Sequence, residues 1–308
     1  MRKKLALVCL SLWLTACATP QMASLQQRWP EALPASATVA DVPFYPQDDY
    51  QCGPAALAMA AGAAGTQLRP EDLVEQVYLP ARQGSLQLEM LAVGRRYGLL
   101  SYQLKPGVEN LLQEVAAGNP AIVLQNLSFS FSPVWHYAVV TGFDRSRNML
   151  RLHSGRTRDM EMSLYTFERT WARADQWAML LLPPTRLPAT ADAPSYAAAA
   201  ALLELTAPKA AQTAYATGLR KWPGQSTLML GAGNMAYALG SLDAAVAAYR
   251  QLTKLHPASA DGWNNLAQAL LDQGKKKEAA VAIQRAVVLG GARLPRYLEL
   301  QNEIQGRR

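Results

Sequence analysis

The sequence has very few cysteines. Of its 308 residues, only Cys9, Cys17 and Cys52 are cysteine. The first two fall in an N-terminal segment that has the composition of an export leader, so Cys52 is the only cysteine expected in the folded body. A disulfide framework and a zinc site built from cysteines are therefore excluded. An unpaired thiol in an exported protein calls for an explanation, and catalysis is the leading one.

The sequence also lacks a concentration of charge. Its net charge of +7 falls to +4 when Arg2, Lys3 and Lys4 leave with the leader, because no acid leaves with them. No basic stretch is interleaved with aromatic residues, so nucleic acid is not indicated as a partner. The sequence has no hydrophobic run long enough to span a membrane and no Walker-type glycine-rich loop. No cofactor and no metal site are predicted.

The first residues have the pattern of a lipoprotein signal peptide. A basic start is followed by an apolar run over 5–14, which is too short to form a stable transmembrane helix. The sequence Leu14-Thr15-Ala16-Cys17 resembles the bacterial lipobox. This resemblance implies that a leader over 1–16 is removed and that Cys17 receives fatty acyl chains such as palmitate. An ordinary secretory leader with a chance cysteine is the alternative.

The residue after the lipidated cysteine suggests a location. Ala18 stands where an aspartate would otherwise follow Cys17. By resemblance to Gram-negative lipoproteins, this implies a lipid anchor in the outer membrane, with the protein on the periplasmic face.

Composition divides the rest of the chain into four parts. We expect a tether over 17–40, a folded domain over 41–183, a Pro- and Ala-rich linker over 184–194 and a helical domain over 195–308. Within the folded domain, hydrophobic periodicity predicts helices first and then antiparallel strands, which is an α+β plan. The expected helices cover a segment starting near Cys52, then 70–78, 86–97 and 108–117, and the expected strands cover 121–124, 135–141, 149–153 and 176–182.

The C-terminal region repeats with a period of 34 residues. The repeated positions are Pro223 with Pro257, Gly240 with Gly274, and Ala211 with Ala245 and Ala279. Small and large residues alternating at this period resemble the tetratricopeptide repeat. The resemblance implies paired helices that present a concave surface to a protein or peptide partner. A generic Ala-rich bundle is the alternative.

The stretch from Gln47 to Met59 carries the strongest chemical signal. Pro54 suits the first turn of a helix, because its φ is fixed and it has no N–H, and the small residues after it form helix well. Cys52 is therefore expected at a helix N-terminus, where free N–H groups and the helix dipole favour a thiolate. Gly53 leaves room for a substrate backbone, and Gln47 places an amide near the sulfur as an oxyanion donor.

A thiol nucleophile needs a base, and the body of the chain offers His136, His153 and His256. His256 lies in the repeat region and fits a helix end. His136 lies on an expected strand and shares a face with Ala138 and Val140, whose small size leaves room for another group over the imidazole. A satisfied core histidine is the alternative. The cysteine at a helix start 84 positions earlier favours the base.

The order of these features is that of papain-like peptidases: a helix with the cysteine, further helices, then a strand with the histidine. More narrowly, residues 40–182 resemble the bacteriocin-processing cysteine peptidase family. The matching blocks are Gln47 with Cys52-Gly53-Pro54-Ala55-Ala56-Leu57-Ala58-Met59, then Gly118-Asn119-Pro120-Ala121-Ile122-Val123-Leu124, His136-Tyr137-Ala138-Val139-Val140-Thr141-Gly142-Phe143-Asp144 and Ser163-Leu164-Tyr165-Thr166-Phe167-Glu168-Arg169-Thr170-Trp171. The resemblance implies a papain-like fold in which Cys52 is the nucleophile, His136 is the base and Gln47 lines the oxyanion hole.

One element of the family's pattern has no counterpart. In the family, an acidic residue on the next strand orients the histidine, but the corresponding place here reads Arg151-Leu152-His153-Ser154-Gly155. If the two strands pair across the turn between them, His153 lies opposite Ala138, on the face of His136. His153 or Ser154 would then replace the orienting acid. Asp144 is the nearest acid, although a solvated turn aspartate is the simpler interpretation.

The sequence therefore predicts an α+β, papain-like cysteine peptidase domain followed by an all-α tetratricopeptide-repeat domain. The predicted function is a lipid-anchored periplasmic enzyme that hydrolyses a peptide or protein substrate and holds a protein partner through its repeats. Attack by a thiol suits an amidase or an acyltransferase equally. The rival from another class is a catalytically decayed peptidase-like scaffold that organises an envelope protein complex, and the missing acid favours it.

Overall fold

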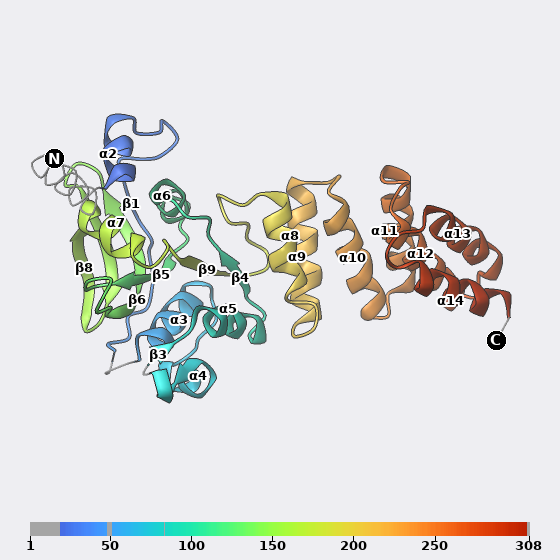
Figure 1. Ribbon diagram of the computed structural model, residues 1–308, viewed down its shortest axis with the longest axis horizontal. Coiled ribbons are helices and arrows are strands. Elements are labelled where there is room, and N and C mark those ends of the chain that lie inside the picture. The colour runs from blue at the N-terminus through green and yellow to red at the C-terminus, as the bar shows by residue number, and fades with distance from the viewer. Residues whose placement is uncertain (1–18, 48–50, 83, 307–308) are drawn as a thin grey trace, which may run out of the picture. The chain divides into compact units, whose positions relative to one another are not determined.

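The computed structural model of the protein describes residues 19–47, 51–82 and 84–306. The chain divides into two compact units (Figure 1). The first unit extends to Pro183 and includes 188–190, and the second contains 184–187 and the residues from Ala191 onward. The first mixes helices with a sheet and the second is built of helices, so the predicted fold class is confirmed. The leader and Cys17 lie outside the described residues.

An antiparallel seven-stranded sheet forms the centre of the first unit. Its strands hydrogen-bond in the order β4-β9-β5-β6-β7-β8, and β1 pairs with β6. The strands are β1 Ser36–Thr38, β4 Leu100–Gln103, β5 Ala121–Asn126, β6 Trp135–Asp144, β7 Met149–Ser154, β8 Thr157–Ser163 and β9 Ala178–Leu182. A small separate sheet pairs β2 Tyr78–Leu79 with β3 Gly84–Ser85. The four predicted strands are present, whereas β1, β2, β3, β4 and β8 were not predicted from the sequence.

Helices surround this sheet, and one of them carries the cysteine at its first residue. The helices are α2 Pro20–Gln27, α3 Cys52–Ala63, α4 Pro70–Val77, the 3₁₀ turn η2 Pro80–Arg82, α5 Gln87–Arg96, α6 Val108–Ala116 and α7 Leu164–Ala172. All residues of α3 from Gly53 to Ala61 are buried. Because most of these residues are small, the helix packs closely against the sheet on one side and other helices on the other.

The segment expected as a tether is part of the fold from Pro20 onward. Helix α2 buries Met22 and Leu25. The backbone N–H groups of Gln21 and Met22 donate to the two oxygens of buried Glu168 on α7, at 3.0 and 2.8 Å. The prediction of an open tether is therefore wrong for these residues. Composition alone gave no sign of the distant carboxylate that satisfies the free N–H groups of the first turn.

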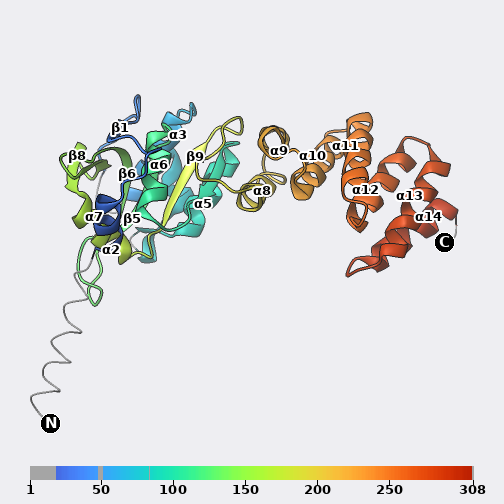
Figure 2. The same ribbon diagram turned by 90° about the horizontal axis from the view of Figure 1, so that it is seen from above.

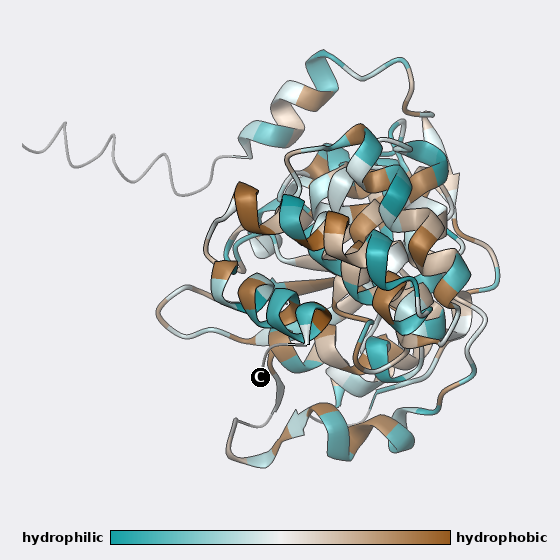
Figure 3. Cartoon of the chain, turned by 90° about the vertical axis from the view of Figure 1, so that its right-hand side faces the viewer, coloured by the Kyte–Doolittle hydropathy of each residue, from teal (hydrophilic) through white to brown (hydrophobic). Residues whose placement is uncertain are grey.

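The second unit consists of consecutive helices packed in pairs. They are α8 Ala193–Ala201, α9 Pro208–Lys221, α10 Ser226–Ala238, α11 Leu242–Leu255, α12 Ala260–Asp272, α13 Lys276–Leu289 and α14 Leu294–Gln305. Figure 3 shows hydrophilic and hydrophobic segments alternating along these amphipathic helices. Gly240 and Gly274 follow helix ends with φ of +79° and +75°, a conformation that favours glycine. The 34-residue period therefore marks the turns between paired helices.

In the part of the chain that the structure describes, no helix is both long and apolar enough to cross a bilayer.

Candidate active site

Cys52, His136 and Gln47 line one cavity of about 780 Å³ in the first unit. They come from three parts of the chain: the start of α3, the start of β6 and the segment between β1 and α3 that contains Gln47. Ser85 and Arg156 also line this cavity. The structure thus brings together the three residues that the sequence analysis singled out as nucleophile, base and oxyanion donor.

Cys52 is half-buried and is the only free cysteine among the described residues. Burial raises the pKa of its thiol, while the backbone N–H groups of Tyr137, Gly53 and Cys52 itself act in the opposite direction. Burial is the larger effect, so the resting residue is a thiol at neutral pH. The expectation of a resting thiolate is not met, because loss of water around the sulfur outweighs the favourable helix N-terminus.

His136 is fixed by a hydrogen bond to Ser154. Its Nε2 lies 2.9 Å from Ser154 Oγ, at the end of the neighbouring strand β7. Burial lowers the pKa of His136, so the imidazole is neutral at pH 7. When Nε2–H donates to Ser154, Nδ1 is left without a proton, and this is the tautomer a base requires. Ser154 therefore occupies the place of an orienting group.

The thiol and the imidazole face one cavity without forming an ion pair. Within the described chain no hydrogen bond joins Cys52 to His136. The backbone N–H of Tyr137, which follows His136 on β6, acts on the Cys52 sulfur, so the start of β6 lies beside the thiol. Catalytic hydrogen bonds are commonly long in uncomplexed enzymes and shorten when substrate binds. The arrangement is therefore a neutral thiol and a neutral imidazole that line the same cavity.

Gln47 presents an unused donor to the same cavity. Its side chain is buried, and Nε2 has no hydrogen-bond partner among the residues that the structure describes. The backbone holds it in place, because the N–H of Gln47 donates to the carbonyl of Gly155 at 3.1 Å. A buried donor without an acceptor is costly, so native proteins seldom keep one without a reason. A developing oxyanion on a substrate carbonyl would supply the missing acceptor.

His153 does not lie where the sequence analysis placed it. It pairs with Val139 rather than Ala138, and the register shifts further along this strand pair between Val140 and Gly142. Because successive side chains point to opposite faces, a difference of one residue turns His153 away from His136 and turns Ser154 toward it. The prediction that His153 orients His136 is therefore wrong, while Ser154 does contact it.

His153 is a satisfied core residue. Only 2% of it is exposed. Its Nε2 lies 3.3 Å from the carbonyl of Val42, and its Nδ1 accepts from the N–H of Asp159 at 3.3 Å. Burial, the largest influence, lowers its pKa and keeps the ring neutral, which fits an Nδ1 that accepts. Both nitrogens are occupied, so neither is available for catalysis.

Asp144 is a turn aspartate and takes no part in this site. Its Oδ1 accepts from Ser146 Oγ at 2.7 Å and from the backbone N–H of Arg147 at 3.2 Å. These bonds, that of Ser146 first, lower the pKa of Asp144. It lies at the opposite end of β6 from His136. Its candidacy as the orienting acid is therefore wrong, and the solvated turn is correct.

Gly53 serves a purpose other than the expected one. A Cβ at this position would collide with the side chain of Ser85 and lie 3.2 Å from the sulfur of Met90. The glycine therefore allows β3 to pack against the start of α3, and the space is not open to a substrate backbone. The sequence analysis missed Ser85 as a cavity residue, because a two-residue strand leaves no periodic signal.

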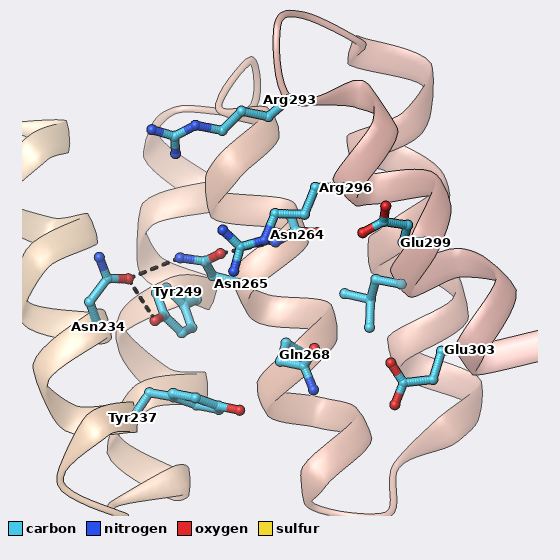
Figure 4. A pocket seen from close by; sticks show the side chains of 11 residues that line it. Asn234, Tyr237, Tyr249, Asn264, Asn265, Gln268, Arg293, Arg296, Glu299 and Glu303 are labelled. Atoms are coloured by element: carbon cyan, nitrogen blue, oxygen red, sulfur yellow. Dashed lines mark hydrogen bonds between the residues drawn. The ribbon is translucent and has the colours of Figure 1, made fainter.

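The second unit contains a polar groove of about 530 Å³ (Figure 4). Asn234 Oδ1 accepts from Asn265 Nδ2 and from Tyr249 O–H, both at 2.9 Å. Asn264 Oδ1 is buried and has no partner in the described chain, and Arg296 also lines the groove. Amides on facing helices are suited to bonding the backbone of an extended chain.

As for metals, the described residues contain no cluster of three or more histidine, cysteine, aspartate or glutamate side chains that would hold an ion.

Both units are similar to known protein families. Residues 39–179 match the model of the Peptidase_C39 like family. Residues 196–250 match the model of the tetratricopeptide repeat, and residues 233–274 match a second model described as TPR repeat. No curated protein matches the chain.

Several solved structures are similar to parts of the chain. A C39-like peptidase from Bacillus anthracis is 16% identical over 48% of this chain and 97% of its own, with a TM-score of 0.40. The peptidase domain of Streptococcus ComA, a bifunctional ABC transporter of a quorum-sensing pathway, is 24% identical over 46% of this chain and 98% of its own, with a TM-score of 0.39. The MamA protein is 14% identical over 47% of this chain and 72% of its own, with a TM-score of 0.33.

Proposed function

The chain carries a Peptidase_C39-like domain followed by tetratricopeptide repeats, and on that premise we propose that it is a thiol-dependent peptide or amide hydrolase. The observation that carries the proposal is the convergence of Cys52, His136 and Gln47 on one cavity. Acyl transfer at a thiol needs a nucleophile, a base and oxyanion donors, and these three side chains supply one of each.

The reaction begins from a neutral pair. The Cys52 sulfur attacks the carbonyl carbon of the substrate while His136 Nδ1 takes the thiol proton. The carbonyl oxygen becomes an oxyanion that accepts from Gln47 Nε2 and the backbone N–H of Cys52. His136 returns the proton to the leaving amine, and a thioester remains on Cys52. Water activated by His136 then hydrolyses the thioester and restores the thiol.

Ser154 positions the base but brings no negative charge to it. Its hydroxyl holds Nε2 at 2.9 Å, which fixes the ring plane, and when the hydroxyl accepts from Nε2–H it leaves Nδ1 free to act as base. A carboxylate at this place would also stabilise the imidazolium that forms during attack. We therefore expect a working enzyme with slower turnover than a chain that has the acid.

A peptidyl electrophile tests the proposal directly. We expect a panel of peptide vinyl sulfones to modify Cys52 of the purified protein with saturable kinetics, and His136→Ala to slow the reaction strongly. Mass spectrometry would locate the adduct, and a pooled peptide substrate would show hydrolysis that Cys52→Ala abolishes. Aminolysis products in place of acids would assign an acyltransferase. Unmodified Cys52 together with an uncleaved pool would overturn the proposal.

The proposal extends to location and partners. Lipidation of Cys17 would anchor the protein in the outer membrane, on the periplasmic face, and the sequence Leu14-Thr15-Ala16-Cys17 supports this. Tetratricopeptide repeats commonly mediate protein–protein contacts, and the polar groove with Asn234 and Asn265 supports binding of a protein or peptide there. Mass spectrometry of the mature N-terminus tests the anchor, since a free amine or an uncleaved leader would contradict it.

A non-catalytic scaffold is the second candidate, and two observations favour it. Among the described residues no carboxylate bonds His136, and burial raises the pKa of Cys52. In this alternative the peptidase-like unit and the repeats organise a protein complex of the envelope. An inert Cys52, with partners still captured by the full chain, would support the scaffold over the enzyme.

A further inference from the structure

The connection between β5 and β6 is an exposed aromatic hairpin. We use the name aromatic hairpin for residues 127–135, which contain no charged residue. The exposed fractions of its large apolar residues are Leu127 44%, Phe129 67%, Phe131 86%, Val134 54% and Trp135 53%. Scattered exposed apolar side chains are ordinary, whereas five within nine residues form a patch that indicates a contact surface.

The aromatic hairpin is held in this exposed conformation by its own hydrogen bonds. The N–H of Leu127 donates to the carbonyl of Val134 at 2.9 Å. Asn126 Oδ1 accepts from the N–H groups of Ser128 and Val134, both at 3.0 Å. The rings of Phe129 and Phe131 stack with centroids 5.3 Å apart. The apolar tip is therefore preformed, which lowers the cost of ordering it against another surface.

The short span between Cys17 and helix α2 indicates which surface the hairpin meets. Thr19 lies two residues after Cys17, and two residues span at most about 7 Å. Helix α2 follows at once and is fixed to the unit through Glu168. An acylated Cys17 would therefore hold the first unit directly against the bilayer. In Figure 2 the green hairpin between β5 and β6 projects on the same side of the first unit as α2.

We propose that the aromatic hairpin is a membrane-contacting element that inserts Phe129 and Phe131 into the interfacial region of a phospholipid bilayer. The orientation rests on the lipid anchor proposed above. Uncharged segments rich in Phe, Trp and Ser suit this region, because the rings leave water while the polar groups stay near the headgroups. Trp135 and Val134 also line the Cys52 cavity. The hairpin therefore places the entrance of that cavity beside the membrane surface.

Fluorescence quenching by brominated lipids tests the insertion. The full-length protein, processed by the host, is reconstituted in vesicles of phosphatidylethanolamine and phosphatidylglycerol. Phe131→Trp adds an emitter at the hairpin tip. Leu88→Trp is the matched control, because Leu88 is 71% exposed on α5 and lies outside the hairpin. We expect shallow brominated lipids to remove the added emission of Phe131→Trp and to leave that of Leu88→Trp unchanged.

The other outcomes are separable. Equal quenching at both positions, or none at Phe131→Trp, would overturn the membrane contact. A rise in KM for peptides in Phe129→Ser/Phe131→Ser, with no quenching at Phe131→Trp, would assign the hairpin to substrate binding instead. The anchor is tested separately by the mass of the mature N-terminus. Loss of the anchor with quenching retained would overturn the anchor alone.

Discussion

His136 and His153 lie on neighbouring strands of one sheet but differ in their surroundings. The imidazole of His136 is half-buried, and that of His153 is buried. On one face, His136 has a single side-chain hydrogen bond within the described part of the chain, to Ser154, and lines the cavity of Cys52. On the other face, His153 has both nitrogens occupied, by the carbonyl of Val42 and the N–H of Asp159. The free ring nitrogen of His136 can accept a proton, whereas His153 is part of the core.

Position within the strand, rather than residue type, therefore separates a candidate base from a structural histidine. Both rings have a pKa lowered by burial, so titration does not tell them apart. What differs is whether a nitrogen remains without a partner. The segment before α3 supplies a neighbour to each histidine: the Val42 carbonyl bonds His153, and Gln47 lines the cavity that His136 also lines.

Replacing His136 should have the largest effect. His136→Ala removes the base and the proton donor for the leaving group, so we expect kcat/KM to fall about 10²–10⁴-fold with the fold intact. Steady-state kinetics on a substrate found with the electrophile panel would measure it. His153→Ala, assayed per folded molecule, is the matched control and should retain activity. Equal losses in the two variants would remove the distinction between the two faces.

Gln47 tests the oxyanion donor on the His136 face. Gln47→Ala should lower kcat about 10²–10³-fold with a small change in KM, because the amide acts mainly in the transition state. Gln87→Ala is the control, since Gln87 lines the same cavity. A change confined to KM would show that Gln47 binds substrate in its ground state.

His153 should matter for stability rather than for chemistry. His153→Ala leaves a cavity and strands the Val42 carbonyl and the Asp159 N–H, so we expect the free energy of unfolding of the first unit to fall by roughly 2–4 kcal/mol. Urea unfolding followed by the near-UV signal would measure it. His256→Ala, whose ring bonds the Gly224 carbonyl in the second unit, should leave the first unit's transition unchanged. An unchanged transition in His153→Ala would contradict its assignment to the core.

Ser154 should have a modest kinetic effect with a distinct pH signature. Ser154→Ala removes one neutral hydrogen bond, so we expect kcat to fall about two- to tenfold. Ser154→Asp places a negative charge beside His136, which favours the protonated ring and raises its pKa. Because the base must be neutral, the acid limb of the pH–rate profile should move to higher pH in that variant. A profile unchanged by Ser154→Asp would show that Ser154 does not contact the working base.

The smallest effect concerns the resting thiol. Because burial raises the pKa of Cys52, the reactive thiolate is scarce at neutral pH and increases as pH rises through that pKa. Iodoacetamide should therefore modify Cys52 more slowly at pH 7 than it modifies a free cysteine peptide, with a midpoint displaced to higher pH. A rate that is already maximal below pH 7 would reveal a thiolate–imidazolium pair and contradict the neutral resting state.

Local signals predicted much of this molecule. Pro54 after Cys52 predicted the start of α3, and alternating apolar residues predicted β6 and β7. The 34-residue spacing of Gly240 and Gly274 predicted the paired helices. Each of these features depends on residues a few positions apart or on a simple period, so the sequence contains the whole signal.

Other features depend on contacts between distant segments. The partner of His136 follows from a register in which Val139, not Ala138, faces His153, and a one-residue difference has no local signature. Residues 20–38 join the fold because Glu168, some 146 positions away, accepts from α2. Gly53 is required by Ser85, which reaches it from a two-residue strand.

Local patterns in the sequence show which chemical groups are present: one thiol at a helix start, two histidines on strands, and a repeating helical module. The tertiary structure alone decided their states and partners. Burial made Cys52 a neutral thiol, strand register gave His136 a hydroxyl in place of an acid, and a distant carboxylate drew the N-terminal segment into the fold. The physical reason is that register and desolvation depend on what surrounds a residue in space, and the nearest neighbours in sequence do not specify it.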